Sequence, residues 1–147
     1  MSSDDYYSSF TAKSSPEETY KKISQVAKWW SENFEGSSAK VEDSFTLRFK
    51  NGDWYKIKVV ELVPTKRIVW DVVDAEQTWH EDRDEWKSTK IIWEITPIHN
   101  SSEISLTHEG LVPELECFEN SKMGWDLLIQ PSLLKFLNEG KGSPQSA

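Results

Sequence analysis

Two neighbouring segments of alternating apolar and polar residues constrain the fold of this chain more than any other feature. Apolar residues occupy every second position from 45 to 49 and from 55 to 59, and Asn51-Gly52 separates the two segments. This pattern predicts two half-buried strands joined as a hairpin. A two-residue loop would place Leu47 opposite Lys56, whereas a three-residue loop ending at a left-handed Gly52 places Leu47 opposite Tyr55. Because a shift of one residue exchanges the two faces of a strand, burial of the apolar face favours the second register.

Further alternating segments predict that this hairpin continues into a larger antiparallel sheet. Pro64-Thr65 is expected to form a turn before a strand at 67–73. A four-residue loop at 99–102 is expected to join strands at 90–98 and 103–108, and a short edge strand is predicted at 8–12. The expected cross-strand pairs are Phe45 with Ile57, Ile57 with Val72, Val59 with Trp70, Ile95 with Leu106 and Trp93 with His108.

A helix start signal follows the first expected strand. Ser15 precedes Pro16, which suits the first helical position, and Glu18 stands three residues after the serine, as in a capping box. Apolar residues then recur at helical spacing and predict a helix to about Trp30. Trp29-Trp30 and Phe34 are expected to end this helix or to open a short second one.

The last third of the chain changes to a helical period. A short helix is expected from Pro113 to about Glu119, and a long one follows with kinking or restarting at Pro131 and an end at Gly140. Its expected apolar face contains Met123, Leu127, Leu134 and Leu137, widened by Trp125, Leu128, Leu133 and Phe136. An order of strand, helix, about six strands and a long helix predicts an α+β architecture, in which helices cover one face of an antiparallel sheet.

Composition and charge exclude several classes of protein. The 147 residues suffice for a single domain, expected at 1–147 with a frayed tail at 141–147. A net charge of −8 disfavours nucleic acid and anionic membranes as partners. The single cysteine excludes an internal disulfide, and the N-terminus lacks the pattern of a secretory signal. We therefore expect a cytoplasmic protein, and a monomer.

Several sequence blocks resemble the START-like, or Bet v 1-like, helix-grip superfamily (SRPBCC), and within it the branch of the activator of heat shock protein 90 ATPase homologue. The blocks are the Trp29-Trp30 pair, KVVELVPTKRIVWDVVD at 58–74, EWKSTKIIWEI at 85–95, THEGLVPELECFE at 107–119, GWDLLIQPSL at 124–133 and GKGSP at 140–144. The resemblance implies a curved antiparallel sheet of about six to seven strands wrapped around a long C-terminal helix, with one or two short helices after the first strand. It also implies a groove between the sheet and that helix.

The resemblance leaves the function open, since members of this superfamily bind hydrophobic small molecules, cyclise polyketides, oxidise ring systems or stimulate a chaperone. The chaperone activators usually carry a second, amino-terminal domain, for which this chain has no room. Large aromatic side chains and one histidine are the expected ligand-binding residues of the groove. They are Trp30, Phe34, Phe45, Tyr55, Trp70, Trp93, His108 and Trp125. The same aromatic rings could instead fill the groove as a solid core, because an empty cavity costs free energy in proportion to its volume.

His108 is the one candidate for acid–base chemistry, because the pKa of an imidazole lies near neutrality. The alternative is that His108 caps a core hydrogen-bond network with Thr107 or Glu109. No nucleophile is visibly paired with it, and Cys117 and Ser132 are candidates by residue type alone. The sequence therefore assigns no catalytic residue and favours a protein that is not an enzyme.

An acidic segment separates two of the expected strands. Residues 76–87 contain Glu81, Asp82, Asp84 and Glu85 around His80, but they lack the glycine and closing glutamate of a calcium-binding loop. We interpret the segment as a solvated loop and expect neither a metal nor a cofactor. Trp79 and Trp86 in this segment are expected either to fold over the groove as a lid or to pack against the end of the sheet.

The favoured function is the binding of a hydrophobic or aromatic small molecule between the sheet and the C-terminal helix. One alternative is a co-chaperone of a heat shock protein 90 type ATPase, and the other is a cyclase or hydrolase that uses His108.

Overall fold

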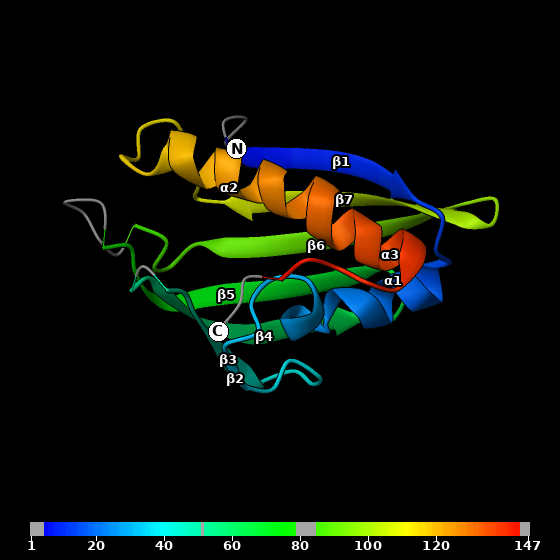
Figure 1. The fold of residues 1–147 in the computed structure, drawn as a ribbon, viewed down its shortest axis with the longest axis horizontal. Coiled ribbons are helices and arrows are strands. Elements are labelled where there is room, and N and C mark those ends of the chain that lie inside the picture. Colours follow the sequence, from blue (N-terminus) through cyan, green and yellow to red (C-terminus); the bar gives the residue numbers. More distant parts are fainter. Residues whose placement is uncertain (1–4, 51, 79–84, 145–147) are drawn as a thin grey trace.

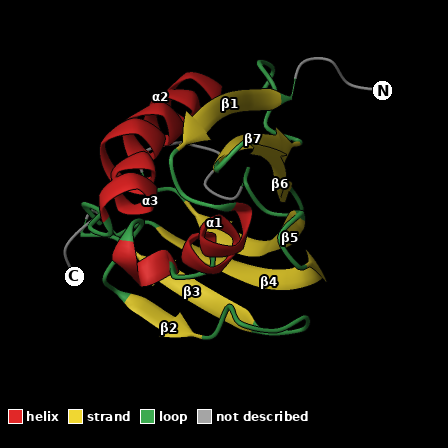
Figure 2. Ribbon diagram, turned by 90° about the vertical axis from the view of Figure 1, so that its right-hand side faces the viewer, coloured by secondary structure: helices red, strands yellow, loops and turns green. Residues whose placement is uncertain are grey.

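The computed structural model describes residues 5–50, 52–78 and 85–144 of the chain, and its main feature is one curved antiparallel sheet with helices on its concave side (Figures 1 and 2). The seven strands are hydrogen-bonded in the order β1-β7-β6-β5-β4-β3-β2. They are β1 (Tyr6–Ala12), β2 (Phe34–Gly36), β3 (Ser44–Arg48), β4 (Trp54–Val63), β5 (Arg67–Glu76), β6 (Lys90–Ile98) and β7 (Ser101–Glu109). The predicted α+β helix-grip fold is confirmed.

Two groups of helices occupy the concave side of the sheet (Figure 2). The first consists of α1 (Pro16–Ile23) and the 3₁₀ turn η1 (Val26–Lys28). The second is a continuous helical segment made of α2 (Phe118–Leu128), the π-helical η2 (Ile129–Leu134) and α3 (Lys135–Glu139). This second segment crosses the sheet (Figure 1). None of the helices in the described part of the chain is long and apolar enough to span a membrane.

The register of the β3–β4 hairpin is the one that the sequence predicts. Leu47 lies opposite Tyr55 and Phe45 lies opposite Ile57, and Gly52 has a φ of 99° in the connecting loop. Only a residue without a side chain adopts this backbone conformation without strain. The buried residues of β3 and β4 therefore share one face, as the alternation of apolar residues requires.

The expected pairing of β4 with β5 is also confirmed, although the connecting turn is one residue longer than predicted. Val59 lies opposite Trp70, but Val63 at the end of the strand lies opposite Arg67 instead of Lys66. A β-bulge at Val60, between the paired residues Val59 and Glu61, absorbs the difference. The bulge therefore restores the register in which apolar side chains face the core.

The predicted register of β6 and β7 is wrong by two residues. Trp93 lies opposite Leu106 instead of His108, because the loop contains only His99 and Asn100. His99 takes a φ of 53°, which permits this tight turn. A shift of two residues keeps every side chain on its face, so the prediction that His108 faces the concave side is unaffected.

The predicted extent of the first helix is also wrong. The Ser15 hydroxyl caps α1 as expected by accepting a hydrogen bond from the Glu18 N–H, at 3.2 Å. However, α1 ends at Ile23, where the Trp29 indole N–H donates to the Ile23 carbonyl at 3.1 Å. This bond satisfies a carbonyl that the end of a helix leaves unpaired. Phe34 opens strand β2 instead of a second helix.

The C-terminal helical segment differs from its prediction in its start and in its buried face. Turns occupy the region before Phe118, where a short helix from Pro113 was expected, and the Glu85 carboxylate accepts the N–H groups of Glu116 and Cys117 near the helix start. The buried apolar side chains of the segment are those of Trp125, Leu133, Phe136 and Leu137, which were expected on the apolar face, and that of Ile129, which was not.

Met123 and Leu127, which were expected on the buried face, are 59% and 64% exposed. The physical reason is the π-helical turn around Pro131, which changes the angular spacing of the residues that follow it. Pro131 thus perturbs the helix without ending it. Gly140, with a φ of 82°, ends it as predicted.

Candidate functional site

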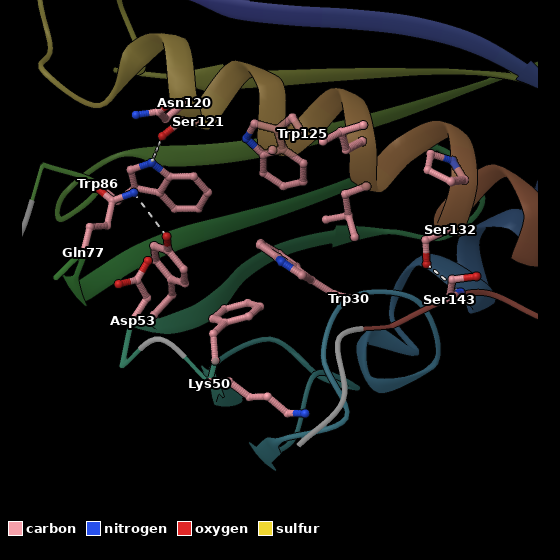
Figure 3. A pocket seen from close by; sticks show the side chains of 16 residues that line it. Trp30, Lys50, Asp53, Gln77, Trp86, Asn120, Ser121, Trp125, Ser132 and Ser143 are labelled. Atoms are coloured by element: carbon pink, nitrogen blue, oxygen red, sulfur yellow. Dashed lines mark hydrogen bonds between the residues drawn. The ribbon is translucent and has the colours of Figure 1, made fainter. Parts of the chain in front are cut away.

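A pocket of about 600 Å³ lies between the sheet and the C-terminal helical segment (Figure 3). The start of β4 with the loop before it, Gln77 directly after β5, and Trp86 form one side, and α2 and η2 form the other. Its volume falls within the range of small-molecule sites, which is roughly 300–1,000 Å³. Five aromatic side chains line it, namely Trp30, Phe49, Tyr55, Trp86 and Trp125.

These five rings form a continuous series of contacts. The ring centroids of Trp30 and Trp125 are 5.0 Å apart, and the rings of Trp125 and Trp86 stack at 5.9 Å with an interplanar angle of 11°. Tyr55 follows at 4.4 Å from Trp86, and Phe49 contacts Tyr55 edge-on at 5.8 Å. Such distances are typical of favourable aromatic pairs. Because each ring is held by its neighbours, the wall presents a preformed aromatic surface.

Polar side chains interrupt this wall at one end, where Gln77 and Asp53 lie (Figure 3). The Gln77 Nε2 donates to the Tyr55 hydroxyl oxygen at 3.1 Å, while the Gln77 Oε1 is buried without a hydrogen-bond partner among the described residues. Asp53 Oδ1 accepts the N–H of Thr78 at 2.8 Å, which ties the loop before β4 to the chain leaving β5.

On the opposite side of the pocket, two serine hydroxyls of the C-terminal helical segment make hydrogen bonds. The Trp86 indole N–H donates to the Ser121 hydroxyl of α2 at 2.9 Å, and this bond fixes the plane of the indole. Farther along, the Ser132 hydroxyl accepts the N–H of Ser143 at 2.8 Å (Figure 3). This contact lies within the tail expected to be frayed, of which residues 145–147 lie outside the described residues.

The strand geometry explains why Tyr55 and Gln77 meet. Tyr55 lies one residue into β4 on its buried face, and its partner on β5 is Ala75. The chain leaves the sheet after Glu76, so Gln77 follows directly and lies close to Tyr55. Burial raises the pKa of Tyr55 above its ordinary value, and the nearby charge of Asp53 adds to this effect. The Tyr55 hydroxyl therefore keeps its proton at neutral pH and can donate it.

The structure brings three of the eight predicted site residues to the pocket. Trp30, Tyr55 and Trp125 line it. The other five lie elsewhere in the concave side: Phe34, Phe45, Trp70, Trp93 and His108 are not among the lining residues. Four of them are fully or almost fully buried, and the half-buried Phe34 stacks on Phe45. Phe34, Phe45, Trp70 and Trp93 fill one end of the groove as a solid core, while the other end stays open. His108 lies at the open end, against Trp86 and Trp125.

His108 belongs to a buried hydrogen-bond network. Its Nε2 lies 2.8 Å from the Thr89 hydroxyl, and its Nδ1 accepts the Trp125 indole N–H at 3.0 Å. Its ring also meets Trp86 edge-on at 4.5 Å. Full burial lowers the pKa of His108 to about 3, so the imidazole is neutral at physiological pH. Its position therefore corresponds to the core-network interpretation, with Thr89 and Trp125 as partners in place of the neighbours in sequence.

The two nucleophile candidates are both buried. Cys117 lies beneath the start of α2, where burial raises the pKa of its thiol to about 11, so the thiol stays protonated. The Ser132 hydroxyl lines the pocket but donates to the Trp29 carbonyl. The neighbouring Glu85 carboxylate raises the pKa of the Cys117 thiol further instead of activating it, and the Ser132 proton is already donated to a backbone carbonyl.

Of the candidate residues in the acidic segment, the structure describes Glu85 and Trp86. Trp86 packs into the pocket wall, 4% exposed, and Glu85 accepts backbone N–H groups near the start of α2. Trp79, His80, Glu81, Asp82 and Asp84 lie outside the described residues. Among the residues that the structure describes, no group of three or more His, Cys, Asp or Glu side chains is placed to hold a metal ion.

Sequence reasoning missed Phe49 and Gln77 as pocket residues. Phe49 was assigned to the buried face of its strand, which is correct, but it is only partly buried because it lies beyond the end of β3. No motif or periodicity in the sequence marks Gln77 as a pocket residue. A polar residue directly after a long apolar strand is the available clue, since the chain there leaves the sheet beside the groove.

Comparisons with known proteins place the chain in a family. A family model described as Activator of Hsp90 ATPase homolog 1-like protein matches residues 15–135. A search of curated proteins found no match.

Several solved structures share the fold. The Aha1 dimer from Colwellia psychrerythraea is 23% identical, with a TM-score of 0.75, and the match covers 94% of this chain and 98% of that one. A protein from Mesorhizobium loti is 16% identical, with a TM-score of 0.72 and coverage of 90% and 95%. A protein from Chromobacterium violaceum is 20% identical, with a TM-score of 0.65 and coverage of 91% and 96%. With a family match across most of its length and the helix-grip fold predicted from its sequence, this chain belongs to the Activator of Hsp90 ATPase homolog 1-like family within the SRPBCC superfamily.

Proposed function

We propose that the protein binds an apolar, aromatic small molecule in the pocket between the sheet and the C-terminal helical segment. The observation that carries this proposal is the wall of five contacting aromatic rings around a volume of about 600 Å³. Four of the rings are only 2–7% exposed and Phe49 is half-buried, so the apolar area that a ligand covers comes from the edges of these rings and the rest of the lining, at about 25 cal/mol per Å² of apolar area. A few polar groups at one end are typical of sites that also orient the ligand.

Gly124 on α2 offers a direct test of this proposal. It lines the pocket, and no heavy atom lies within 4 Å of where its Cβ would be. Gly124→Leu therefore adds bulk on the pocket side without a steric clash, and it replaces a residue that disfavours helix. Gly124→Ala is the matched control, since it gives the same helical benefit with little bulk.

The experiment screens flavonoids, sterols and fatty acids by amide chemical shifts in NMR. We expect saturable shifts on β4, the end of β5 and α2 with the wild-type protein and with Gly124→Ala. Gly124→Leu should bind at least about tenfold more weakly, which corresponds to about 1.4 kcal/mol. Absence of shifts across the whole panel at high concentration would refute the proposal, and so would unchanged binding by the filled variant.

A second candidate function rests on the family match. The matching model is described as Activator of Hsp90 ATPase homolog 1-like protein, and a structurally similar protein is an Aha1. A co-chaperone function predicts that the purified chain raises the turnover of a heat shock protein 90 type ATPase. An unchanged ATPase rate at saturating concentrations of the chain would reject it. The Gly124→Leu variant separates the two functions, because it should lose ligand binding while an ATPase stimulation that does not use the pocket stays unchanged.

An enzyme based on His108 has the least support. The imidazole is fully buried, does not line the pocket and has a pKa of about 3. A general base needs to reach the substrate proton and to have a pKa near the working pH. Neither condition is met by this side chain.

A further inference from the structure

Gln77 is an unusual residue within the pocket wall. Only 1% of its surface is exposed, it lines the pocket, and its Oε1 is buried without a hydrogen-bond partner in the described part of the chain. Buried polar atoms are almost always paired, because a lost hydrogen bond to water otherwise goes uncompensated. An unpaired acceptor beside a pocket therefore indicates that a bound ligand donates the missing hydrogen bond.

The amide of Gln77 works together with the hydroxyl of Tyr55. The Gln77 Nε2 donates to the Tyr55 oxygen at 3.1 Å, so the hydroxyl keeps its own proton for another acceptor. The pair thus offers one acceptor and one donor side by side. The terminal torsion of a glutamine side chain is broad, and its rotation presents either the oxygen or the nitrogen of the amide to the pocket. A ligand group that both donates and accepts satisfies each of these arrangements.

The charges around this end of the pocket disfavour an anionic ligand group. Asp53 lines the same end, and its charge already contributes to holding the Tyr55 hydroxyl protonated. A ligand carboxylate would meet the same repulsion and would place acceptor oxygens against the Gln77 oxygen. The pocket-lining cation, Lys50, is exposed and extends away from Gln77 (Figure 3).

From this geometry we propose that Gln77 and Tyr55 form a polar anchor that selects a neutral aromatic ligand bearing a hydroxyl group, such as a phenol. The proposal rests on the function proposed above and names the chemical class of its ligand. The ligand hydroxyl donates to Gln77 and accepts from Tyr55, while its ring lies against the aromatic wall that includes Trp86. Fatty acids and aromatic carboxylates are then poor ligands.

Three probes of nearly equal shape test the proposal: 2-naphthol, 2-methylnaphthalene and 2-naphthoate. We expect the wild-type protein to bind 2-naphthol about tenfold more tightly than 2-methylnaphthalene in isothermal titration. 2-Naphthoate should bind more weakly than 2-naphthol. In Gln77→Leu the preference for the hydroxyl over the methyl group should disappear. The variant should also be at least as stable as the wild type, because an apolar side chain of similar size leaves no unpaired amide.

Two further variants complete the experiment. Gln25→Leu makes the same substitution at an exposed position outside the pocket and should keep the preference. Tyr55→Phe removes one oxygen and should reduce the preference about threefold, which provides the test if Gln77→Leu does not fold.

The outcomes separate this inference from the proposed function. If the wild-type protein binds none of the probes, the proposed function fails and the inference fails with it. If it binds 2-naphthol and 2-methylnaphthalene equally, or if Gln77→Leu and Tyr55→Phe keep the preference, the polar anchor is refuted while the aromatic pocket stands.

Discussion

The two ends of the groove between sheet and helices contain the same kinds of side chain but differ in packing. At the sealed end, Trp70 and Trp93 are fully buried, and their rings meet edge-on at 5.9 Å. At the open end, Trp86 and Trp125 stack at a similar distance but border a pocket of about 600 Å³. Aromatic residues therefore mark the concave side of this fold without indicating where it is filled.

Polar groups distinguish the two ends more clearly than the aromatic rings do. The indole nitrogens of Trp70 and Trp93 have no hydrogen-bond partner among the described residues, whereas those of Trp86 and Trp125 donate to Ser121 and His108. The sealed end therefore contributes mainly apolar burial. The open end holds its rings in fixed orientations by hydrogen bonds, as a binding surface requires.

The largest effect is expected at the sealed end. Trp93→Ala removes a fully buried ring that contacts three other tryptophans, so we expect the free energy of unfolding to fall by about 3–5 kcal/mol. Urea denaturation measures this change. Trp54→Ala, on the other face of β4, is the matched control and should cost clearly less because Trp54 is only partly buried. Equal costs for the two variants would show that the sealed end is not a packed core.

An intermediate effect is expected from the buried network that His108 forms with Thr89 and Trp125 behind the pocket wall. The pKa of His108 is lowered from 6.5 to about 3 by burial, so the unfolded chain binds a proton more readily than the folded one. Stability is then lost as pH falls below 6.5, with a slope of up to about 1.4 kcal/mol per pH unit, and does not depend on His108 above neutrality. Comparing the unfolding free energies of wild type and His108→Gln between pH 7 and pH 4.5 isolates this contribution. Parallel curves would contradict a buried neutral imidazole.

The smallest effect on stability is expected at the rim of the open end. Phe49 is only partly buried and contacts Tyr55 at 5.8 Å, so Phe49→Ala should cost about 1 kcal/mol, as typical for such sites. It should nevertheless weaken binding of an aromatic ligand, because the residue forms part of the wall. Thermal unfolding and titration of the same samples measure both effects. A large loss of stability with unchanged binding would reverse the distinction drawn between the two ends.

The strand pairings that could be predicted are those in which an error would exchange the faces of a strand. A shift of one residue between β3 and β4 would place Lys56 opposite Leu47, so the apolar pattern selects a single register. In β6 and β7 the error was two residues, which keeps Trp93 and His108 facing inward and leaves the pattern equally satisfied. Only the geometry of the turn at His99 decides between such alternatives.

The site was less predictable than the fold. Trp30, Tyr55 and Trp125 were identified from residue type, but residue type alone also selected Trp70 and Trp93, which are core. The helix face was mispredicted at Met123 and Leu127, because the π-helical turn at Pro131 breaks the regular period from which faces are inferred. Gln77 lies in the pocket through the pairing of β4 with β5, a long-range contact that no local pattern reveals.

The most direct test of the open pocket follows the indole N–H signals of the tryptophans by NMR while 2-naphthol is added to the wild-type protein. We predict saturable shifts for Trp86 and Trp125, which line the pocket, and much smaller ones for Trp70 and Trp93. Absence of saturable shifts, or equal shifts in both pairs, would contradict a groove that is open at one end and sealed at the other.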